Sequence, residues 1–196
     1  MSFRIEEKFP CTKFEQKKIL VDLQKIGLKT LHPKREIRSI YFDNNHKRMF
    51  EESQEGSVPR KKIRIREYPL HDKTISLETK ISSVEGKYKN SIAIQDDQKL
   101  KLLKFGRVDS LYGLCFPIIE VSYLRHYFLL DKVRITIDED IIYKIYNSKI
   151  TKRDPVNVIE VKAPADVSEG YLKKLIPISR RRFSKYSRGC ELLSIS

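Results

Sequence analysis

The segment KIRIRE, residues 62–67, alternates charged and hydrocarbon side chains, and similar alternation recurs along much of the chain. Successive side chains of a β-strand point to opposite faces of the sheet. Lys62, Arg64 and Arg66 are therefore expected on one face, and Ile63 and Ile65 on the other. A repeat of two residues in so many segments indicates a fold built mainly from strands.

The remaining pattern predicts a few helices beside these strands. Strands are predicted at 3–9, 36–44, 60–68, 73–81, 86–94, 118–130, 132–138, 141–146 and 156–162. Helices are predicted at about 13–26 before Gly27, about 96–104 before Gly106, about 168–175 and about 182–193. Short connections favour antiparallel pairing. We expect one α+β domain over 1–196, predominantly antiparallel β, forming a barrel with helices packed outside.

Six predicted strands have a charged face opposite a mostly apolar one. These faces hold ten cations and four carboxylates, in the groups Arg4/Glu6/Lys8, Lys62/Arg64/Arg66, Glu78/Lys80, Lys87/Lys89, Arg134/Thr136/Asp138 and Glu160/Lys162. In an ordinary antiparallel sheet the charged faces would meet water. In a closed barrel they could instead line the interior, but cations buried together would then need a polyanionic ligand, the carboxylates and a metal ion to compensate them. Periodicity alone leaves both arrangements open.

The charge balance narrows the class of partner. Lys and Arg number 40 against 26 Asp and Glu, a formal charge of +14. This excess indicates nucleic acid, an anionic membrane surface or a phosphate-rich molecule as partner. The charged strands interleave Ile and Val rather than the aromatic residues that stack on bases, and no RNA-binding motif is present, so nucleic acid ranks below a phosphate polymer.

Sequence signals for location point to the cytoplasm. No apolar segment is long enough to span a bilayer, and the first residues contain no signal-peptide core. The three cysteines are scattered, which favours a reducing compartment. A cytoplasmic protein is expected, unless an unseen protein partner carries it to a membrane.

Eight segments, in their order and spacing, resemble one known family. They are FRIEEKF, IRSIYFDN, KIRIREY, SLETK, YLRHYF, RITID, VIEVK and RRFSKYSRG, spread over about residues 3–191. Together they resemble the polyphosphate polymerase domain of the vacuolar transporter chaperone (VTC) complex, one of the CYTH-like triphosphate tunnel metalloenzymes. The resemblance implies a closed eight-stranded barrel around a basic tunnel that uses a divalent metal, Mn²⁺ or Mg²⁺. It also implies transfer of the terminal phosphate of ATP onto a growing inorganic polyphosphate chain.

The resemblance also implies roles for the matching residues. It implies catalytic contacts with the phosphates for Arg64, Arg66, Lys80, Arg134 and Lys185. Phosphate or nucleotide binding is implied for Lys8, Lys87, Lys89, Arg125, Lys162 and Ser184. Metal binding is implied for Glu160 and Glu6, with Glu78 as a further candidate for orienting the metal. Among the alternatives, Lys87 and Lys89 could be solvated, Asp138 could begin a turn, and Tyr41 could be a core aromatic.

One departure bears on the type of reaction. The E-x-E-x-K signature of the wider superfamily appears as Arg4-x-Glu6-x-Lys8, so its first acid is missing. This favours the VTC type over a two-metal triphosphatase. The predicted function is a phosphotransferase acting on ATP and polyphosphate. The alternatives are a metal-dependent inorganic tripolyphosphatase of the same fold and a non-catalytic polyphosphate-binding module.

Overall fold

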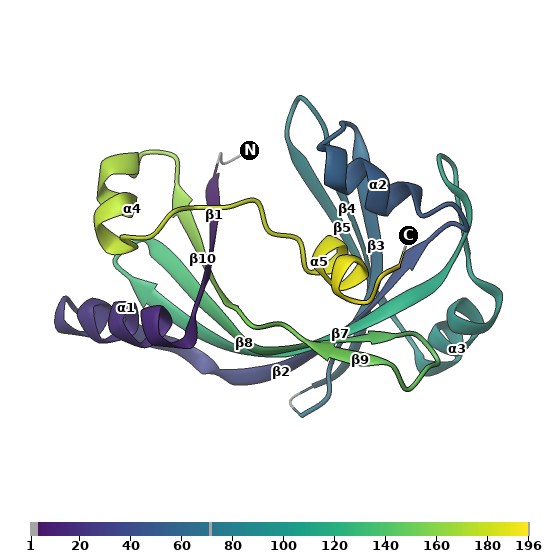
Figure 1. Ribbon diagram of the computed structural model, residues 1–196, viewed down its shortest axis with the longest axis horizontal. Coiled ribbons are helices and arrows are strands. Elements are labelled where there is room, and N and C mark those ends of the chain that lie inside the picture. Colours follow the sequence, from purple (N-terminus) through teal and green to yellow (C-terminus); the bar gives the residue numbers. More distant parts are fainter. Residues whose placement is uncertain (1–3, 71, 196) are drawn as a thin grey trace. The chain divides into compact units, whose positions relative to one another are not determined.

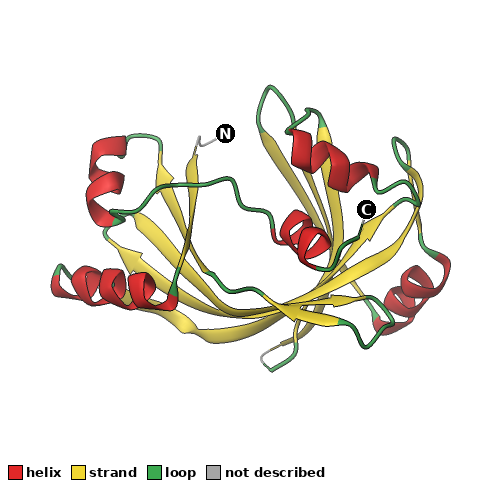
Figure 2. Ribbon diagram, viewed as in Figure 1, coloured by secondary structure: helices red, strands yellow, loops and turns green. Residues whose placement is uncertain are grey.

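The computed structural model describes residues 4–70 and 72–195, and most of its regular structure is strand (Figure 2). Phe3, at the start of the first predicted strand, lies outside the described residues. The strands are β1 (Arg4–Cys11), β2 (Lys29–Asp43), β3 (Arg60–Tyr68), β4 (Asp72–Ser82), β5 (Lys87–Ile94), β6 (Arg107–Asp109), β7 (Gly113–Leu130), β8 (Val133–Ile145), β9 (Thr151–Arg153) and β10 (Asn157–Pro164).

The helices are α1 (Lys13–Lys25), α2 (Arg48–Glu55), α3 (Asp96–Phe105), α4 (Glu169–Leu175) and α5 (Lys185–Leu192). Local sequence explains where α1 begins and ends. Thr12 Oγ1 accepts a hydrogen bond from the amide of Glu15 at 3.2 Å, and the Glu15 carboxylate accepts one from the amide of Thr12 at 2.8 Å. Gly27, at φ +98°, lets the amide of Leu28 turn back to the carbonyl of Leu23.

The strands form one ten-stranded sheet in the order β1-β10-β8-β7-β2-β3-β4-β5, with β6 beside β7 and β9 beside β8 (Figure 1). The pairs β1–β10, β10–β8, β2–β3, β3–β4 and β4–β5 are antiparallel. The predominantly antiparallel fold with a few helices is therefore confirmed. The order ends at β1 on one side and β5 on the other, so the closed barrel is not shown among the described residues.

The residues of the chain form two compact units. The first contains residues 4–35, 123–141 and 154–183, and the second contains 36–70, 72–122, 142–153 and 184–195. The long strands β2, β7 and β8 contribute residues to both units. The expectation of a single domain over 1–196 stays a prediction.

In the first unit, helices cover the apolar face of the sheet. Ile19 and Leu23 of α1 and Leu172 of α4 pack with Phe9 of β1 and neighbouring strand residues in one buried cluster. Each of these side chains is removed from water, which stabilises the unit through the hydrophobic effect. Glu6 and Lys8 of β1 and Glu160 and Lys162 of β10 alternate with these residues and therefore point to the other face.

In the second unit, one face of β3 is buried and the opposite, charged face is partly shielded from water. Ile63 and Ile65 are fully buried, as expected for the apolar face. On the charged face, Arg66 is only 8% exposed. Helix α5 lies against this charged face, because Tyr186 stacks on Tyr41 of β2 with ring centroids 5.3 Å apart. The charged face of β3 is therefore not a fully solvent-exposed surface.

Several expected boundaries were wrong. Strand β2 begins at Lys29 rather than about residue 36, and α2 was not predicted. Strand β8 runs without a break from Val133 to Ile145, where a turn was expected near Asp138. Asp140 takes a positive φ of +53° within the strand, and this local irregularity replaces the turn. Helix α5 begins at Lys185, because the preceding Ser184 is its N-cap.

Gly189 allows α5 to approach the sheet closely. A Cβ at this position would lie 2.7 Å from Ile119 Cδ1 and 2.7 Å from Tyr143 Cδ1. We expect Gly189→Ala to lower the free energy of unfolding by about 1–3 kcal/mol through overpacking. Gly170 of α4 has open space around it, so Gly170→Ala is the matched control and should be neutral or stabilising by at most about 1 kcal/mol. Urea unfolding of both variants tests this; equal effects would contradict it.

Candidate functional site

Lysines from three neighbouring strands of the second unit face one another directly. Lys62 of β3 lies opposite Lys80 of β4, and Lys80 lies opposite Lys89 of β5. Side chains directly opposite on antiparallel strands are about 4.5–5.5 Å apart at Cβ, and like charges there repel. A row of three lysines is therefore unfavourable unless an anion compensates it.

The next rows of the same face add two arginines and one carboxylate. Arg64 lies opposite Glu78, and Arg66 lies opposite Ser76. Glu78 Oε2 accepts hydrogen bonds from Arg64 Nε at 2.8 Å and Nη2 at 2.5 Å, and Glu78 Oε1 accepts one from Lys89 Nζ at 2.6 Å. Arg66 Nη1 lies 3.9 Å from Glu78. We call this group the cation patch: Lys62, Arg64, Arg66, Glu78, Lys80 and Lys89.

The electrostatics of the cation patch are visible in the pKa values of Glu78 and of the adjacent Tyr41. Burial raises the pKa of Glu78, but the charges of Arg64 and Arg66 outweigh burial and bring this pKa down to about 2. Tyr41 Oη accepts a hydrogen bond from Arg64 Nη1 at 2.8 Å. Burial raises the pKa of Tyr41 as well, yet Arg64 and Arg66 hold it below its usual value. The patch is a region of strongly positive potential.

The low pKa of Glu78 predicts a pH dependence of stability. A carboxylate with a depressed pKa in the folded state stabilises the fold above its unfolded pKa, near 4.5, and loses this contribution as the pH falls towards about 2. We expect Glu78→Gln to be less stable at neutral pH and to lose less stability in this window. Urea unfolding at several pH values tests this, with the exposed Glu51→Gln as control. An unchanged acid profile in Glu78→Gln would contradict it.

A second network attaches α5 to this face. Lys62 Nζ donates a hydrogen bond to Ser184 Oγ at 2.7 Å, which places the N-cap of α5 beside the lysine row. Tyr186 Oη donates to Asp43 Oδ2 at 2.6 Å. Asp43 is fully buried, and its carboxylate also accepts hydrogen bonds from the backbone amides of Asn44, Met49 and Phe50 near the start of α2. Lys185, between Ser184 and Tyr186, contributes to the potential at Tyr41.

The first unit carries a different arrangement, in which charges alternate in sign. Lys8 of β1 lies opposite Glu160 of β10, and Glu6 lies opposite Lys162. Lys162 in turn lies opposite Arg134 of β8, and Glu160 lies opposite Thr136. Opposite charges thus face one another between β1 and β10, whereas Lys162 and Arg134 place two cations opposite each other between β10 and β8. We call this group the carboxylate patch: Glu6, Lys8, Arg125, Arg134, Thr136, Asp138, Glu160 and Lys162.

Glu160 is the centre of the carboxylate patch. It is 7% exposed, with Lys162 Nζ at 3.1 Å and Arg125 Nη2 at 3.6 Å. Burial raises its pKa, but the charges of Lys8, Arg125 and Lys162 and a hydrogen bond with Glu6 hold this pKa well below the usual range. Glu160 is therefore ionised at neutral pH.

Asp138 positions Arg125 within this patch. The guanidinium of Arg125 donates two hydrogen bonds to Asp138, from Nε at 2.5 Å and from Nη2 at 2.7 Å. Asp138 is fully buried. It lies inside β8, so its alternative assignment to the start of a turn was wrong. A bidentate pair of this kind fixes the orientation of the arginine.

The donor set of the carboxylate patch fits a divalent metal only together with substrate. No cluster of three or more His, Cys, Asp or Glu able to hold a metal occurs within 4–70 and 72–195. Glu6 and Glu160 nevertheless bring two carboxyl groups within hydrogen-bonding reach. Opposite Glu160, the buried Thr136 hydroxyl has no hydrogen-bond partner in the described part of the chain. Mg²⁺ and similar ions are commonly held by one or two carboxylates plus phosphates and water.

The structure places the expected residues in these two patches. Of the predicted set, Arg64, Arg66, Lys80 and Lys89 lie in the cation patch, with Ser184 and Lys185 on α5 beside it. Glu6, Lys8, Arg125, Arg134, Glu160 and Lys162 lie in the carboxylate patch, where Arg134 is exposed. Lys87 is exposed, two residues from Lys89 on the same face of β5. Their roles stay predictions.

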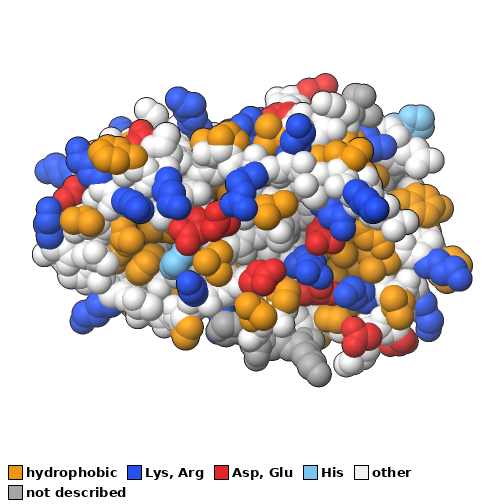
Figure 3. Space-filling model, turned by 60° about the horizontal axis from the view of Figure 1, so that its bottom comes forward, with side chains coloured by type: hydrophobic (Ala, Val, Ile, Leu, Met, Phe, Trp, Pro, Cys, Tyr) orange, Lys and Arg blue, Asp and Glu red, His pale blue; other side chains and the backbone are white. Residues whose placement is uncertain are grey.

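Sequence reasoning missed three contributions to these patches. Lys62 shares the face of Arg64 by simple alternation, so its place was predictable although no role was assigned to it. Asp138 positions Arg125, which is 13 residues away in the sequence, and Asp43 anchors Tyr186 of α5, which is 143 residues away. No local sequence pattern predicts such contacts. By contrast with the cation patch, charges of both signs are mixed on the face of the molecule shown in Figure 3, where basic, acidic and hydrophobic side chains are interspersed.

The comparison with protein families identifies the chain. The VTC domain family matches residues 1–114 and 112–194. The chain belongs to the VTC domain family. No curated protein matches it. No helix in the described residues has the length and apolarity to cross a membrane.

Solved structures share the fold at low sequence identity. A proposed adenylate cyclase from Bacillus halodurans is 14% identical, with a TM-score of 0.62 over 93% of this chain and 94% of the other. A conserved hypothetical protein from Pyrococcus furiosus is 16% identical, with a TM-score of 0.58 over 94% and 99%. A proposed adenylyl cyclase from Hippeastrum, described as having a dominant triphosphatase activity, is 14% identical, with a TM-score of 0.57 over 97% and 96%. These likenesses show that the chain shares its overall fold with these proteins.

Proposed function

We propose that this protein is a polyphosphate polymerase that transfers the γ-phosphate of ATP onto inorganic polyphosphate. The observation that carries the proposal is the row of Lys62, Lys80 and Lys89, adjoining Arg64 and Arg66. Three of these cations, Arg64, Arg66 and Lys89, contact the same carboxylate, Glu78. A chain of phosphates supplies several negative charges at a regular spacing and would relieve this repulsion.

Most of the proposed mechanism rests on positioning and charge. Phosphoryl transfer needs in-line alignment and neutralisation of charge on the transferring oxygens, and little covalent chemistry from the protein. Arg64, Arg66 and Lys80, with Arg134 and Lys185, would bind phosphate oxygens. The acceptor is a phosphate oxyanion that is already ionised, so no strong general base is required. Lys8, Lys87, Lys89, Arg125, Lys162 and Ser184 would bind the remaining phosphates or the nucleotide.

A divalent metal, Mn²⁺ or Mg²⁺, is part of the proposal. Glu160 and Glu6 would hold it, and when bound it would neutralise charge on the phosphate oxygens. The charges of Lys8, Arg125 and Lys162 hold the pKa of Glu160 low and so favour its ionised form, which is the state that a metal ligand needs. We also include closure of the sheet into an eight-stranded tunnel, which would exclude water and favour transfer over hydrolysis. Cytoplasmic location and an unseen protein partner belong to the same proposal.

A metal-dependent tripolyphosphatase is the second candidate. The fold shared with the Hippeastrum protein, which is described as a triphosphatase, favours it. The missing first acid of the superfamily signature, Arg4 in this chain, favours the polymerase. A polyphosphate-binding module without catalysis is the third candidate.

One experiment separates these functions. The purified chain is incubated with ATP and Mn²⁺, and its products are resolved by length on a gel, with a chelator in the control. We expect a ladder of long polyphosphate that disappears with the chelator. Release of orthophosphate alone would indicate the hydrolase. Tight, metal-independent polyphosphate binding without turnover would overturn both enzymatic assignments.

A further inference from the structure

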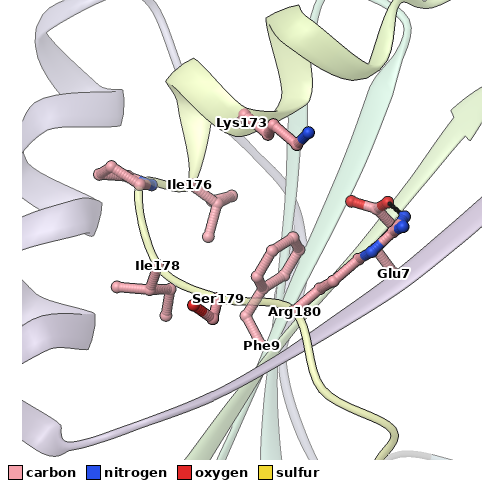
Figure 4. A pocket seen from close by; sticks show the side chains of 8 residues that line it. Glu7, Phe9, Lys173, Ile176, Ile178, Ser179 and Arg180 are labelled. Atoms are coloured by element: carbon pink, nitrogen blue, oxygen red, sulfur yellow. Dashed lines mark hydrogen bonds and ion pairs between the residues drawn. The ribbon is translucent and has the colours of Figure 1, made fainter.

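A pocket of about 520 Å³ lies in the first unit, on the side of β1 that carries Glu7 and Phe9 (Figure 4). Segment 176–180, which follows α4, forms the opposite wall. Glu7 and Phe9 alternate along β1 with Glu6 and Lys8, so the pocket opens on the face away from the carboxylate patch. Its volume is in the usual range for a site that binds a small molecule.

The floor of the pocket is apolar. Phe9 is 3% and Ile176 1% exposed, and Ile178 packs beside the buried cluster to which both belong. Figure 4 shows the Phe9 ring pointing into the space between Ile176 and Ile178 on one side and Arg180 on the other. An apolar group placed on this floor would be removed from water.

Two cations at the rim converge on one oxygen. Glu169 Oε1 lies 3.5 Å from Lys173 Nζ and 3.4 Å from Arg180 Nη1. Both distances exceed those of direct charge-assisted hydrogen bonds, and all three side chains are more than half exposed. Arg180 is also anchored by the buried Glu7, through a 2.7 Å hydrogen bond from Nη1. Lys173 and Arg180 thus both lie near one oxygen of Glu169, at longer range than the direct hydrogen bond between Arg180 and Glu7.

We propose that this pocket binds a small amphipathic organic anion. Its phosphate or carboxylate group would displace Glu169 between Lys173 and Arg180, and its hydrocarbon part would cover Phe9, Ile176 and Ile178. The proposal is independent of the function proposed above.

The same segment connects the pocket to Lys8. Beyond Arg180, the amide of Arg181 donates to the carbonyl of Lys8 at 2.9 Å, and Lys8 Nζ donates to the carbonyl of Phe183 at 3.1 Å. A ligand that moves segment 176–180 would therefore change the surroundings of Lys8, which belongs to the carboxylate patch.

The probe is octyl phosphate below its micelle concentration, titrated by calorimetry with saturating tripolyphosphate present to occupy the basic patches. We expect octyl phosphate to bind at least about tenfold more tightly than inorganic phosphate, because its alkyl chain leaves water when it lies on the apolar floor. Equal affinities for the two would overturn the proposal.

Variants locate the binding. Lys173→Gln should weaken octyl phosphate binding about tenfold. The neighbouring Lys174 does not line the pocket, so Lys174→Gln is the matched control and should bind as the wild type does. Glu169→Gln should tighten binding, because it removes the competing carboxylate, and Ile178→Asp should abolish it. Equal effects of Lys173→Gln and Lys174→Gln would place the binding elsewhere.

Two further arms complete the test. Vesicles containing phosphatidic acid compete with octyl phosphate if a lipid headgroup is the natural ligand, and fail to compete if the ligand is soluble. In amide NMR spectra, octyl phosphate should shift Lys8 and Phe183 in the wild type but not in Ile178→Asp. Shifts confined to the pocket lining would overturn the connection to Lys8.

Discussion

Replacing Glu160 with glutamine is expected to lower metal-dependent turnover by about 100-fold or more. The amide keeps the shape of the side chain but removes the negative charge that a divalent metal requires. It also leaves Lys162 and Arg125 without the carboxylate they now contact at 3.1 and 3.6 Å. Turnover of ATP and tripolyphosphate should be measured across a range of Mn²⁺ concentrations, together with Mn²⁺ binding by electron paramagnetic resonance.

Glu139→Gln is the matched control for this experiment. Glu139 lies in β8, in the same compact unit as Glu160. It contacts His126 of β7 and Gln16 of α1, on the face of the sheet away from Glu160. Its replacement should leave turnover and Mn²⁺ binding close to those of the wild type. Normal metal-dependent rates and Mn²⁺ binding in Glu160→Gln would show that the metal assignment is wrong.

Asp43→Ala is expected to lower the free energy of unfolding by about 3–5 kcal/mol. Asp43 accepts hydrogen bonds from three backbone amides and from the Tyr186 hydroxyl, and it is fully buried. Removing it leaves four donors without this acceptor in a region that water does not reach. Burial raises the pKa of Tyr186 well above its usual value, so its hydroxyl stays protonated and donates to Asp43.

Tyr186→Phe separates the two roles of Asp43. It keeps the stacking on Tyr41 and removes only the hydrogen bond between α5 and Asp43, so the loss should be about 1–2 kcal/mol. Urea unfolding monitored by circular dichroism measures both variants. A loss in Asp43→Ala no larger than that in Tyr186→Phe would show that the amides near α2 do not depend on Asp43.

The alternation in KIRIRE was enough to predict which side chains share a face. Arg64 and Arg66 do lie on one face and Ile63 and Ile65 on the other, because the period of a strand follows from backbone geometry alone. The helix ends at Gly27 and Gly106 were predictable for the same local reason, since both glycines take a positive φ. The ordered motifs also indicated the family that the domain match then established.

The pairing of the strands could not be predicted from local sequence. KIRIRE and LETK do not reveal that Lys62, Lys80 and Lys89 fall into one row, because register depends on the turns and on packing across the whole sheet. Nor does DED reveal that Asp138 stays inside a continuous strand and holds Arg125. The partial shielding of the charged face of β3 likewise depends on α5, which follows more than a hundred residues later in the chain.

The sequence by itself therefore determined the strand-rich composition of the fold, the face on which each charge lies, and the excess of cations that calls for a polyanion. These are properties of neighbouring residues and of the total charge. Only the tertiary structure decided which cations stand opposite one another and which carboxylates hold them. Those contacts join residues distant in the chain, and their energies depend on separation and burial, which no local pattern contains.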